Sequence, residues 1–237
     1  RYAGFHEITL LDYSRSQLEQ ARRRLGDGRR YRYVVADVYR MPFGPAAFDA
    51  ATMIRTLHHM QDPPAALERI RRTLEDSGVF VLEFANKRNL KAILRWALRR
   101  QAWSPFDPAP VEFARLNYDF HPATVSGWLA AAGFHVERRL PVSHLRLGWL
   151  KRNVALGILL WMEGLFQRLG GAWLYTPSVF VRARAEAVQG SAVGSGGGFW
   201  RCPACDSLEI SETESGLDCR KCGRHWLKRD GIYELKT

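Results

Sequence analysis

Apolar residues along this chain form short runs that alternate with segments of helical spacing. Runs of strand length, rich in Val, Ile, Leu and Phe, predict strands at 8–11, 31–36, 48–54, 79–84, 134–140 and 178–183. Capping residues and apolar positions three and four residues apart predict helices at 14–25, 62–74 and 122–132. Strands that alternate with helices predict an α/β fold, with a mostly parallel sheet covered on both faces.

Two of these helices begin at residues suited to helix starts. Ser14 or Ser16 can cap the first helix with its hydroxyl group. Asp62 can cap the second, because the two prolines after it suit the first turn of a helix.

Two long insertions, 86–119 and 142–177, interrupt the alternation, and such segments often form lids or substrate walls. Residues 86–103 carry six basic residues, no acidic residue and apolar residues at helical spacing, which predicts a basic amphipathic helix. Three roles stay open for it: a lid with a solvated face, an anionic membrane surface, or phosphate contacts with RNA. The apolar run 154–166 is too short to span a membrane. The apolar residues of the second insertion favour a hydrophobic acceptor slightly, although packing of this insertion against the sheet is the commoner outcome.

Residues 186–198 read EAVQGSAVGSGGG and have almost no large side chains. Such a segment buries too little apolar area to offset the entropy of ordering it, so we expect a flexible linker. Its glycines do not predict a phosphate loop, because no helix start follows them. The expected domains are therefore 1–185 and 199–237.

All four cysteines lie in the last segment, as two CxxC pairs separated by 13 residues. Four thiolates at this spacing match a structural zinc ribbon, with Cys202, Cys205, Cys219 and Cys222 as the ligands. A segment of 39 residues has too small a core to fold without such a metal. Metal-bound thiolates favour a reducing compartment, so we expect a cytoplasmic protein.

The composition agrees with the predicted globular α/β fold, and the distribution of charge indicates which part of the chain is basic. The 237 residues are 46% apolar and 25% charged, which excludes collagen-like, coiled-coil and wholly disordered chains. Residues 199–237 carry seven basic and seven acidic residues, so the net charge of +11 belongs to the rest of the chain. Nucleic acid, anionic lipid and acidic substrates are all compatible with a basic body.

Carboxylates follow the first two expected strands, where an open parallel sheet binds its ligands. Asp12 can accept two hydrogen bonds from a ribose diol, and Asp37 can hold the amino group of a purine. Tyr13 and Val38 would flank such a ligand.

Several other side chains are candidates for proton transfer. His58 and His59 follow the third expected strand, where a neutral imidazole can accept a proton. Glu83, Asn86 and His121 are further candidates, for which a structural role is favoured.

The segments LLDYS, VVADVYRMPF, FDAATMIRTLHHM and SGVFVLEF together resemble the class I S-adenosylmethionine-dependent methyltransferases, over residues 5–183. The resemblance implies a Rossmann-like sheet, mostly parallel with a reversed last strand. It also implies that Asp12 binds the ribose of S-adenosylmethionine, that Asp37 and the Val38 backbone bind its adenine, and that Ile54 borders its methionine part.

Two features depart from that family. The glycine-rich loop after the first strand is missing, and residues 1–5 resemble the end of the helix that follows it, so the chain looks truncated there. The second departure is at 75–78, which read EDSG where a proline and two glycines are usual.

The end of the chain, CGRHWLKRDGIYELKT, resembles the small zinc-binding family that activates tRNA and protein methyltransferases. The resemblance implies docking of the ribbon on the methyltransferase domain of the same chain. Three functions follow: methylation of a small hydrophobic acceptor, which we favour over RNA; methylation of tRNA or a translation protein; and a non-enzymatic binding module with a degenerate sheet domain.

Overall fold

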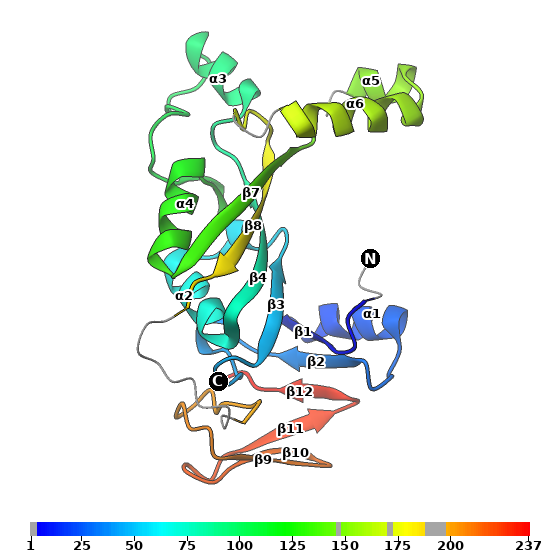
Figure 1. Ribbon diagram of the computed structural model, residues 1–237, viewed down its shortest axis with the longest axis vertical. Coiled ribbons are helices and arrows are strands. Elements are labelled where there is room, and N and C mark those ends of the chain that lie inside the picture. Colours follow the sequence, from blue (N-terminus) through cyan, green and yellow to red (C-terminus); the bar gives the residue numbers. More distant parts are fainter. Residues whose placement is uncertain (1–3, 146–147, 170–172, 188–197) are drawn as a thin grey trace. The chain divides into compact units, whose positions relative to one another are not determined.

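The computed structural model describes residues 4–145, 148–169, 173–187 and 198–237. It contains two compact units: unit 1 combines Arg1–Ala47 with Ser191–Thr237, and unit 2 spans Phe48–Gly190 (Figure 1). Most of the expected linker, residues 188–197, lies outside the described residues. The expected boundaries at 185 and 199 stay a prediction.

Unit 1 begins with a strand, a helix and a second strand, as the apolar pattern predicts. The elements are β1 (Ile8–Asp12), α1 (Arg15–Leu25), β2 (Tyr31–Val35) and the 3-10 turn η1 (Val38–Arg40). β1 and β2 are parallel, with Asp12 opposite Val35. The expected hydroxyl cap of α1 is not formed, because the hydroxyl groups of Ser14 and Ser16 lie 2.9 Å apart and bond to each other.

The cysteine-rich tail forms a small antiparallel sheet in the same unit. Its strands are β9 (Ile210–Thr213), β10 (Gly216–Cys219), β11 (His225–Arg229) and β12 (Ile232–Glu234). β12 also pairs in parallel with β2, which gives a six-stranded sheet in the order β1-β2-β12-β11-β10-β9. The tail thus covers an edge of β2 that would otherwise present unpaired backbone groups.

Side chains reinforce this pairing of β12 with β2. Ile232 of β12 shares a buried cluster with Leu18 of α1 and Tyr33 of β2. The Arg15 guanidinium bonds the carboxylates of Glu234 and Asp230 on the tail side. The core of this unit is thus assembled from residues that are about 200 positions apart in the sequence.

Gly216 offers a direct test of the packing within the tail sheet. Its φ is +152°, and a Cβ at this position would lie 1.8 Å from the carbonyl oxygen of Trp226. Because backbone cannot move aside cheaply, we expect Gly216→Ala to lower the thermal unfolding midpoint of the tail by several degrees or more. Gly28→Ala is the matched control, since no atom lies within 4 Å of the added Cβ. An equal midpoint for the two variants would contradict this packing.

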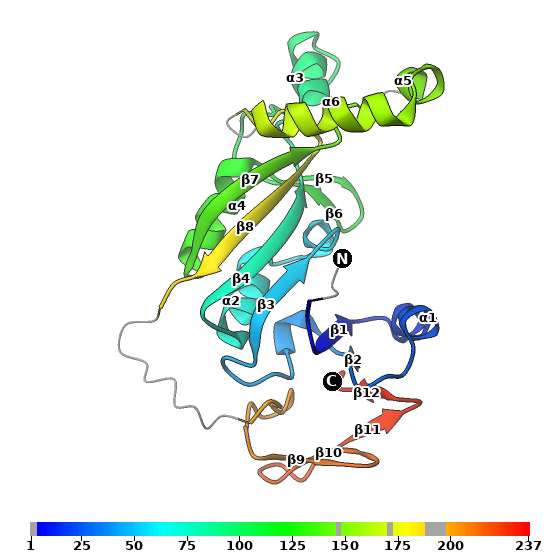
Figure 2. The same ribbon diagram turned by 45° about the vertical axis from the view of Figure 1, so that its right-hand side comes forward.

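Unit 2 is built around a second, four-stranded sheet. Its main elements are β3 (Phe48–Met53), η2 (Leu57–His59), α2 (Pro63–Thr73), β4 (Leu74–Ala85), α4 (Pro122–Ala131), β7 (Phe134–Val142) and β8 (Ser178–Ala185). The strand order is β3-β4-β8-β7; β3 and β4 are parallel, and β8 is antiparallel to both of its neighbours. The reversed last strand therefore agrees with expectation. α2 and α4 pack on each other beside one face of the sheet (Figure 2).

Two expectations about the strands need correction. No ladder in the described residues joins β1 or β2 to β3, so the expected single sheet is two sheets. The segment between β2 and β3 bonds the tail instead: Gly44 N donates to Phe199 O at 2.9 Å and Arg201 N to Pro42 O at 2.9 Å. β4 also starts earlier than expected, directly after α2, and includes residues 75–78. Gly78 is required there, because a Cβ would lie 2.9 Å from Glu75 O.

The first insertion contains α3 (Leu90–Ala97) and the hairpin β5 (Val111–Ala114) and β6 (Asn117–Asp119). α3 is shorter than the expected helix over 86–103: the Asn89 side chain caps its start by accepting from Ala92 N, and the helix ends at Ala97. Lys87 is a second correction: its side chain is buried, and Nζ donates to Asp107 O at 2.8 Å and Ala109 O at 2.6 Å. Burial lowers the pKa of Lys87.

The second insertion forms α5 (Gly148–Asn153) and α6 (Leu156–Leu169). α6 lies across one end of the four-stranded sheet and contacts β7 (Figure 2). The Glu163 carboxylate fixes it there by accepting hydrogen bonds from the backbone of Ser143 and from both the backbone and the ring of His144. Among the described helices, none is long and apolar enough to cross a bilayer.

Candidate cofactor, acceptor and metal sites

Asp12 and Asp37 lie at the same end of two adjacent parallel strands in unit 1. Asp12 ends β1, and its carbonyl accepts from Ala36 N at 3.1 Å, one residue before Asp37. One oxygen of each carboxylate stabilises the turn that follows: Asp12 Oδ1 accepts from Ser14 N at 2.7 Å and Asp37 Oδ1 from Tyr39 N at 2.9 Å. Each carboxylate is thus fixed by its own backbone.

This arrangement can bind a nucleoside. The carboxyl ends of parallel strands are where open α/β sheets bind ligands, and a fixed carboxylate binds hydroxyl and amino donors without first having to be ordered. Tyr13 leaves β1 with 58% of its surface exposed, and Val38 begins η1. The four residues expected around an adenosine therefore lie on two neighbouring strand ends, and their binding role stays a prediction.

The tail adds residues to this region that the sequence did not indicate. Lys236 Nζ lies 3.4 Å from the centre of the Tyr13 ring, and Arg40 Nη1 donates to Thr237 Oγ1 at 3.2 Å. A hollow of about 380 Å³ opens between Tyr13, Val35 and tail residues that include Trp226 and Lys236. No local signal could have shown this, because the tail reaches this region by pairing of β12 with β2, a strand that lies far away in the sequence.

The remaining expected site residues, Ile54, His58 and His59, belong to unit 2 and follow β3. Ile54 is exposed, and the two histidines form part of η2 with ring centres 3.9 Å apart. The ring nitrogen Nδ1 of His59 lies 3.1 Å from Leu116 O, next to β6. Glu83 fixes the turn before them, because its Oε2 accepts from the backbone of Arg55 at 2.8 Å.

His58 has the properties of a proton acceptor. Burial lowers the pKa of His58, and the nearby His59 and Arg55 lower it further, against an opposing effect of Glu83. These effects favour the neutral form of the ring, which can take a proton.

Asp119 is a site candidate that sequence analysis missed. It ends β6, which packs beside η2, and burial raises the pKa of its carboxyl group. A carboxyl group of raised pKa can exchange a proton closer to neutral pH than an exposed one. The only available signal was its place just before α4, in the stretch NYDFHP.

Three other candidates hold the fold together. Besides its bond to Arg55, Glu83 accepts from the Ser178 hydroxyl. Asn86 is buried, and its amide donates to Leu174 O at 2.6 Å and Thr176 O at 2.7 Å. His121 caps α4 by accepting from Ala123 N at 3.2 Å. These bonds favour the structural role expected for all three.

The four cysteines come together in the tail, with sulfur atoms all within 4.8 Å of one another. The Sγ atoms of Cys202 and Cys222 are 3.8 Å apart, and those of Cys205 and Cys219 are 3.5 Å apart. Tetrahedral zinc with bonds of about 2.3 Å requires sulfur atoms about 3.8 Å apart, whereas a disulfide would bring them to about 2 Å. The donor set fits zinc.

The chemistry of the cluster also calls for a cation. The Ser207 amide lowers the pKa of Cys205, but burial and the three neighbouring thiols outweigh it and raise that pKa to about 12. Without a cation the Cys205 thiol keeps its proton at neutral pH, whereas a bound metal favours thiolate ligands. Turns at both knuckles, closed by Asp206 N to Cys202 O and Gly223 N to Cys219 O at 2.9 Å each, position the sulfur atoms.

The chain is similar in sequence to known methyltransferases. Residues 1–82 match the sequence model of a family described as methyltransferase domain. The demethylmenaquinone methyltransferase of Clavibacter sepedonicus is 30% identical over 148 residues, which are 58% of this chain and 60% of that protein. The enzyme of the same name from Thermotoga maritima is 32% identical over 108 residues, 45% of this chain and 46% of that one. The chain thus spans about half the length of these relatives.

Solved structures share the fold at lower identity. An S-adenosylmethionine-dependent methyltransferase from Mesorhizobium loti matches with a TM-score of 0.51 and 17% identity, over 76% of this chain and 80% of that one. A complex of the Haloferax volcanii Trm112 methyltransferase activator with a putative methyltransferase matches with a TM-score of 0.51 and 15% identity. The match covers 77% of this chain and 73% of the matched chain. The chain therefore has the Rossmann-like α/β fold of methyltransferases, and residues 1–82 are similar to a methyltransferase domain.

Proposed function

We propose that the protein is an S-adenosylmethionine-dependent methyltransferase that acts on a small hydrophobic acceptor. The observation that carries this proposal is the pair of fixed carboxylates, Asp12 and Asp37, on adjacent strand ends within the segment that matches a methyltransferase domain. Relatives named demethylmenaquinone methyltransferase support an acceptor of this kind.

Each candidate residue would bind a different part of S-adenosylmethionine. S-adenosylmethionine, when bound, supplies a methyl group activated by its sulfonium charge. Asp12 would accept hydrogen bonds from the ribose hydroxyls, while Asp37 and the Val38 backbone would hold the adenine edge. Ile54 would border the methionine part. Catalysis then depends mainly on holding the acceptor in line and excluding water.

His58 and His59, which follow β3, would accept the proton released by the acceptor. An acceptor that keeps its proton at neutral pH must lose it as the new bond to the methyl group forms. The neutral ring of His58 can accept that proton, and His59 is the second candidate.

The tail is proposed to be a zinc ribbon that docks on the methyltransferase part of the same chain. The sulfur spacing supports one zinc ion held by four thiolates, as expected in a reducing cytoplasm. The pairing of β12 with β2 supports docking by addition of a strand to a sheet edge. Docking would fix β2, and Asp37 follows the end of this strand by two residues.

Methylation of tRNA or a translation protein is the second candidate. The tail resembles the activator family, and the fold is shared with the methyltransferase complex of Haloferax volcanii. A non-enzymatic binding module is the third.

A methyl-transfer assay on the full-length protein separates the three functions. We expect label from methyl-tritiated S-adenosylmethionine to enter a demethylated isoprenoid quinol, and not tRNA or a protein extract. His58→Ala should slow transfer at least tenfold while binding of S-adenosylmethionine is kept. Label in tRNA or protein alone would favour the second function. Failure to bind S-adenosylmethionine at all would leave only the binding module.

A further inference from the structure

α6 exposes large apolar side chains on most of its surface. Leu156, Leu160 and Trp161 keep 71%, 63% and 69% of their surface exposed, and Ile158 and Leu165 are exposed as well. A helix this apolar is normally buried. Its main contact within unit 2 is with β7, and the exposure of these side chains leaves its outer side without apolar cover among the described residues.

A second exposed element, α3 with the residues after it, combines apolar and basic side chains. Leu90, Leu94, Trp96 and Leu98 are exposed. Exposed basic residues lie between them, at Lys91, Arg95, Arg99 and Arg100. This is the composition of helices that lie in the interface of an anionic membrane.

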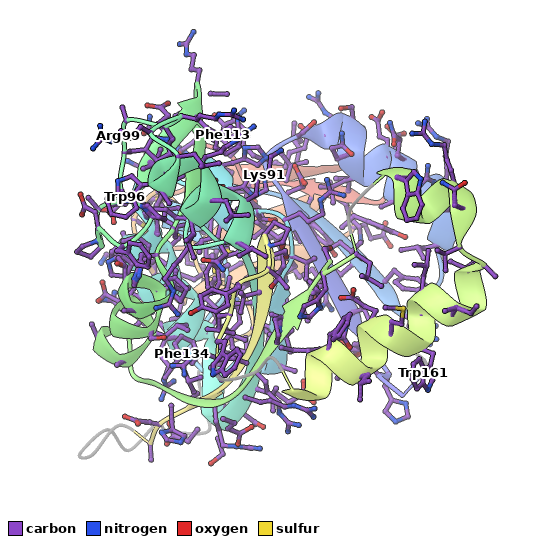
Figure 3. All side chains as sticks on the ribbon, turned by 90° about the horizontal axis from the view of Figure 1, so that it is seen from above. Lys91, Trp96, Arg99, Phe113, Phe134 and Trp161 are labelled. Atoms are coloured by element: carbon purple, nitrogen blue, oxygen red, sulfur yellow. The ribbon has the colours of Figure 1, made fainter. Side chains whose placement is uncertain are left out.

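The two elements belong to the same end of unit 2. Leu90 N at the start of α3 donates to Tyr175 O at 2.8 Å, and the Asn86 amide donates to Leu174 O, so α3 is bonded to the segment after α6. Figure 3, seen from above, shows Lys91 and Trp96 on α3, Arg99 shortly after α3, and Trp161 on α6. We call this the α3–α6 surface.

Acidic residues are almost absent from the α3–α6 surface. Residues 86–106 contain no acidic residue, and α5 and α6 contain only Glu163. The Glu163 carboxylate is engaged by the backbone of Ser143 and His144 and is directed towards the sheet. The surface therefore offers apolar side chains and positive charge together, with little negative charge to repel phospholipid headgroups.

We propose that the α3–α6 surface docks on an anionic phospholipid bilayer, with the side chains of α6 and α3 inserted among the headgroups. Tryptophans favour the membrane interface, and the leucines add apolar area that RNA phosphates would not bind. α6 has 14 residues, so it lies in the interface and does not span it.

Docking at this end would place the bilayer near the candidate acceptor site. β3, β4 and β7 run in the same direction and end here, at Met53, Ala85 and Val142. His58 and His59 follow the end of β3. An acceptor dissolved in the membrane could then reach the protein without crossing water. The docking itself does not depend on the proposed methyl transfer.

Vesicle co-sedimentation of the full-length protein tests the proposal. Vesicles of phosphatidylcholine with about a third phosphatidylglycerol should bind at least tenfold more protein than phosphatidylcholine alone, and high salt should weaken binding. Leu160→Glu/Trp161→Glu and Arg95→Glu/Arg99→Glu should each weaken binding at least tenfold.

A matched control variant separates binding by the α3–α6 surface from a general effect of net charge. Arg23→Glu/Arg24→Glu on α1 changes the net charge by the same amount as the α3 pair, at exposed positions of unit 1. Equal losses for the two arginine pairs would overturn the proposal, since binding would then follow net charge alone. Absence of binding to both vesicles would overturn it too, as would a dimer that Leu160→Glu/Trp161→Glu converts to a monomer without any vesicle binding. Unchanged circular dichroism of each variant confirms that it is folded.

Discussion

Removal of zinc is expected to unfold the cysteine-rich tail. Zinc held by four thiolates contributes about 10 kcal/mol or more to the folding of small domains, and this tail has little core of its own. Chelation, or Cys219→Ser, should therefore abolish the β9–β12 sheet and expose the β2 edge to solvent. Metal analysis should find one zinc per chain, and hydrogen exchange should show β2 losing protection together with the tail.

His225→Ala is the control for this experiment. His225 lies close to the knuckles in sequence, but its ring bonds Asp218 Oδ1 at 2.6 Å, outside the cluster of sulfur atoms. This variant should keep its zinc and its folded tail. A tail that stays folded with far less than one metal ion per chain would contradict the zinc proposal.

Asp12→Asn is expected to reduce the affinity for S-adenosylmethionine at least 100-fold. Asn keeps an oxygen for the Ser14 amide, so the turn after β1 is preserved. The change removes the charge that accepts from two ribose hydroxyls, and each hydrogen bond to a charged group contributes about 1.5–3 kcal/mol, which multiplies to about 10²–10⁴ in affinity. Titration calorimetry on the full-length protein measures the loss.

Asp27→Asn provides the matched change for the Asp12 experiment. Asp27 is an exposed carboxylate of the same unit, paired with Arg22 away from the strand ends. The Asp27→Asn variant should bind S-adenosylmethionine with an affinity within about twofold of the wild type. Asp37→Ala should lower this affinity about tenfold or more. Wild-type affinity in Asp12→Asn would remove the main support for the adenosine site.

Local pattern predicted most of the elements in both units. The strands and helices expected from apolar spacing agree with β1, α1, β2, β3, α2, α4, β7 and β8 to within a few residues. Asp62 caps α2 as expected, because its carboxylate and the amide it binds lie three residues apart. Features of this kind depend on neighbours along the chain, so they can be predicted from the sequence.

Predictions failed where distant segments decide the outcome. Lys87 was expected on a basic surface, but two carbonyls of a later loop bind its ammonium and bury it. The expected single sheet is two sheets, in which β2 pairs with the tail strand β12 and the described residues form no ladder from β1 or β2 to β3. In both cases the partner lies at least 20 residues away, and no local spacing identifies it.

The sequence by itself determined the strand and helix order, the two carboxylates that follow β1 and β2, and the four cysteines at zinc-ligand spacing. Only the tertiary structure decided that β12 pairs with β2, that Lys236 lies over the Tyr13 ring, and that α6 keeps its apolar side chains exposed. The physical reason is that pairing and burial depend on which edges and faces remain free after all elements have packed, whereas the sequence pattern specifies only what each element can bury.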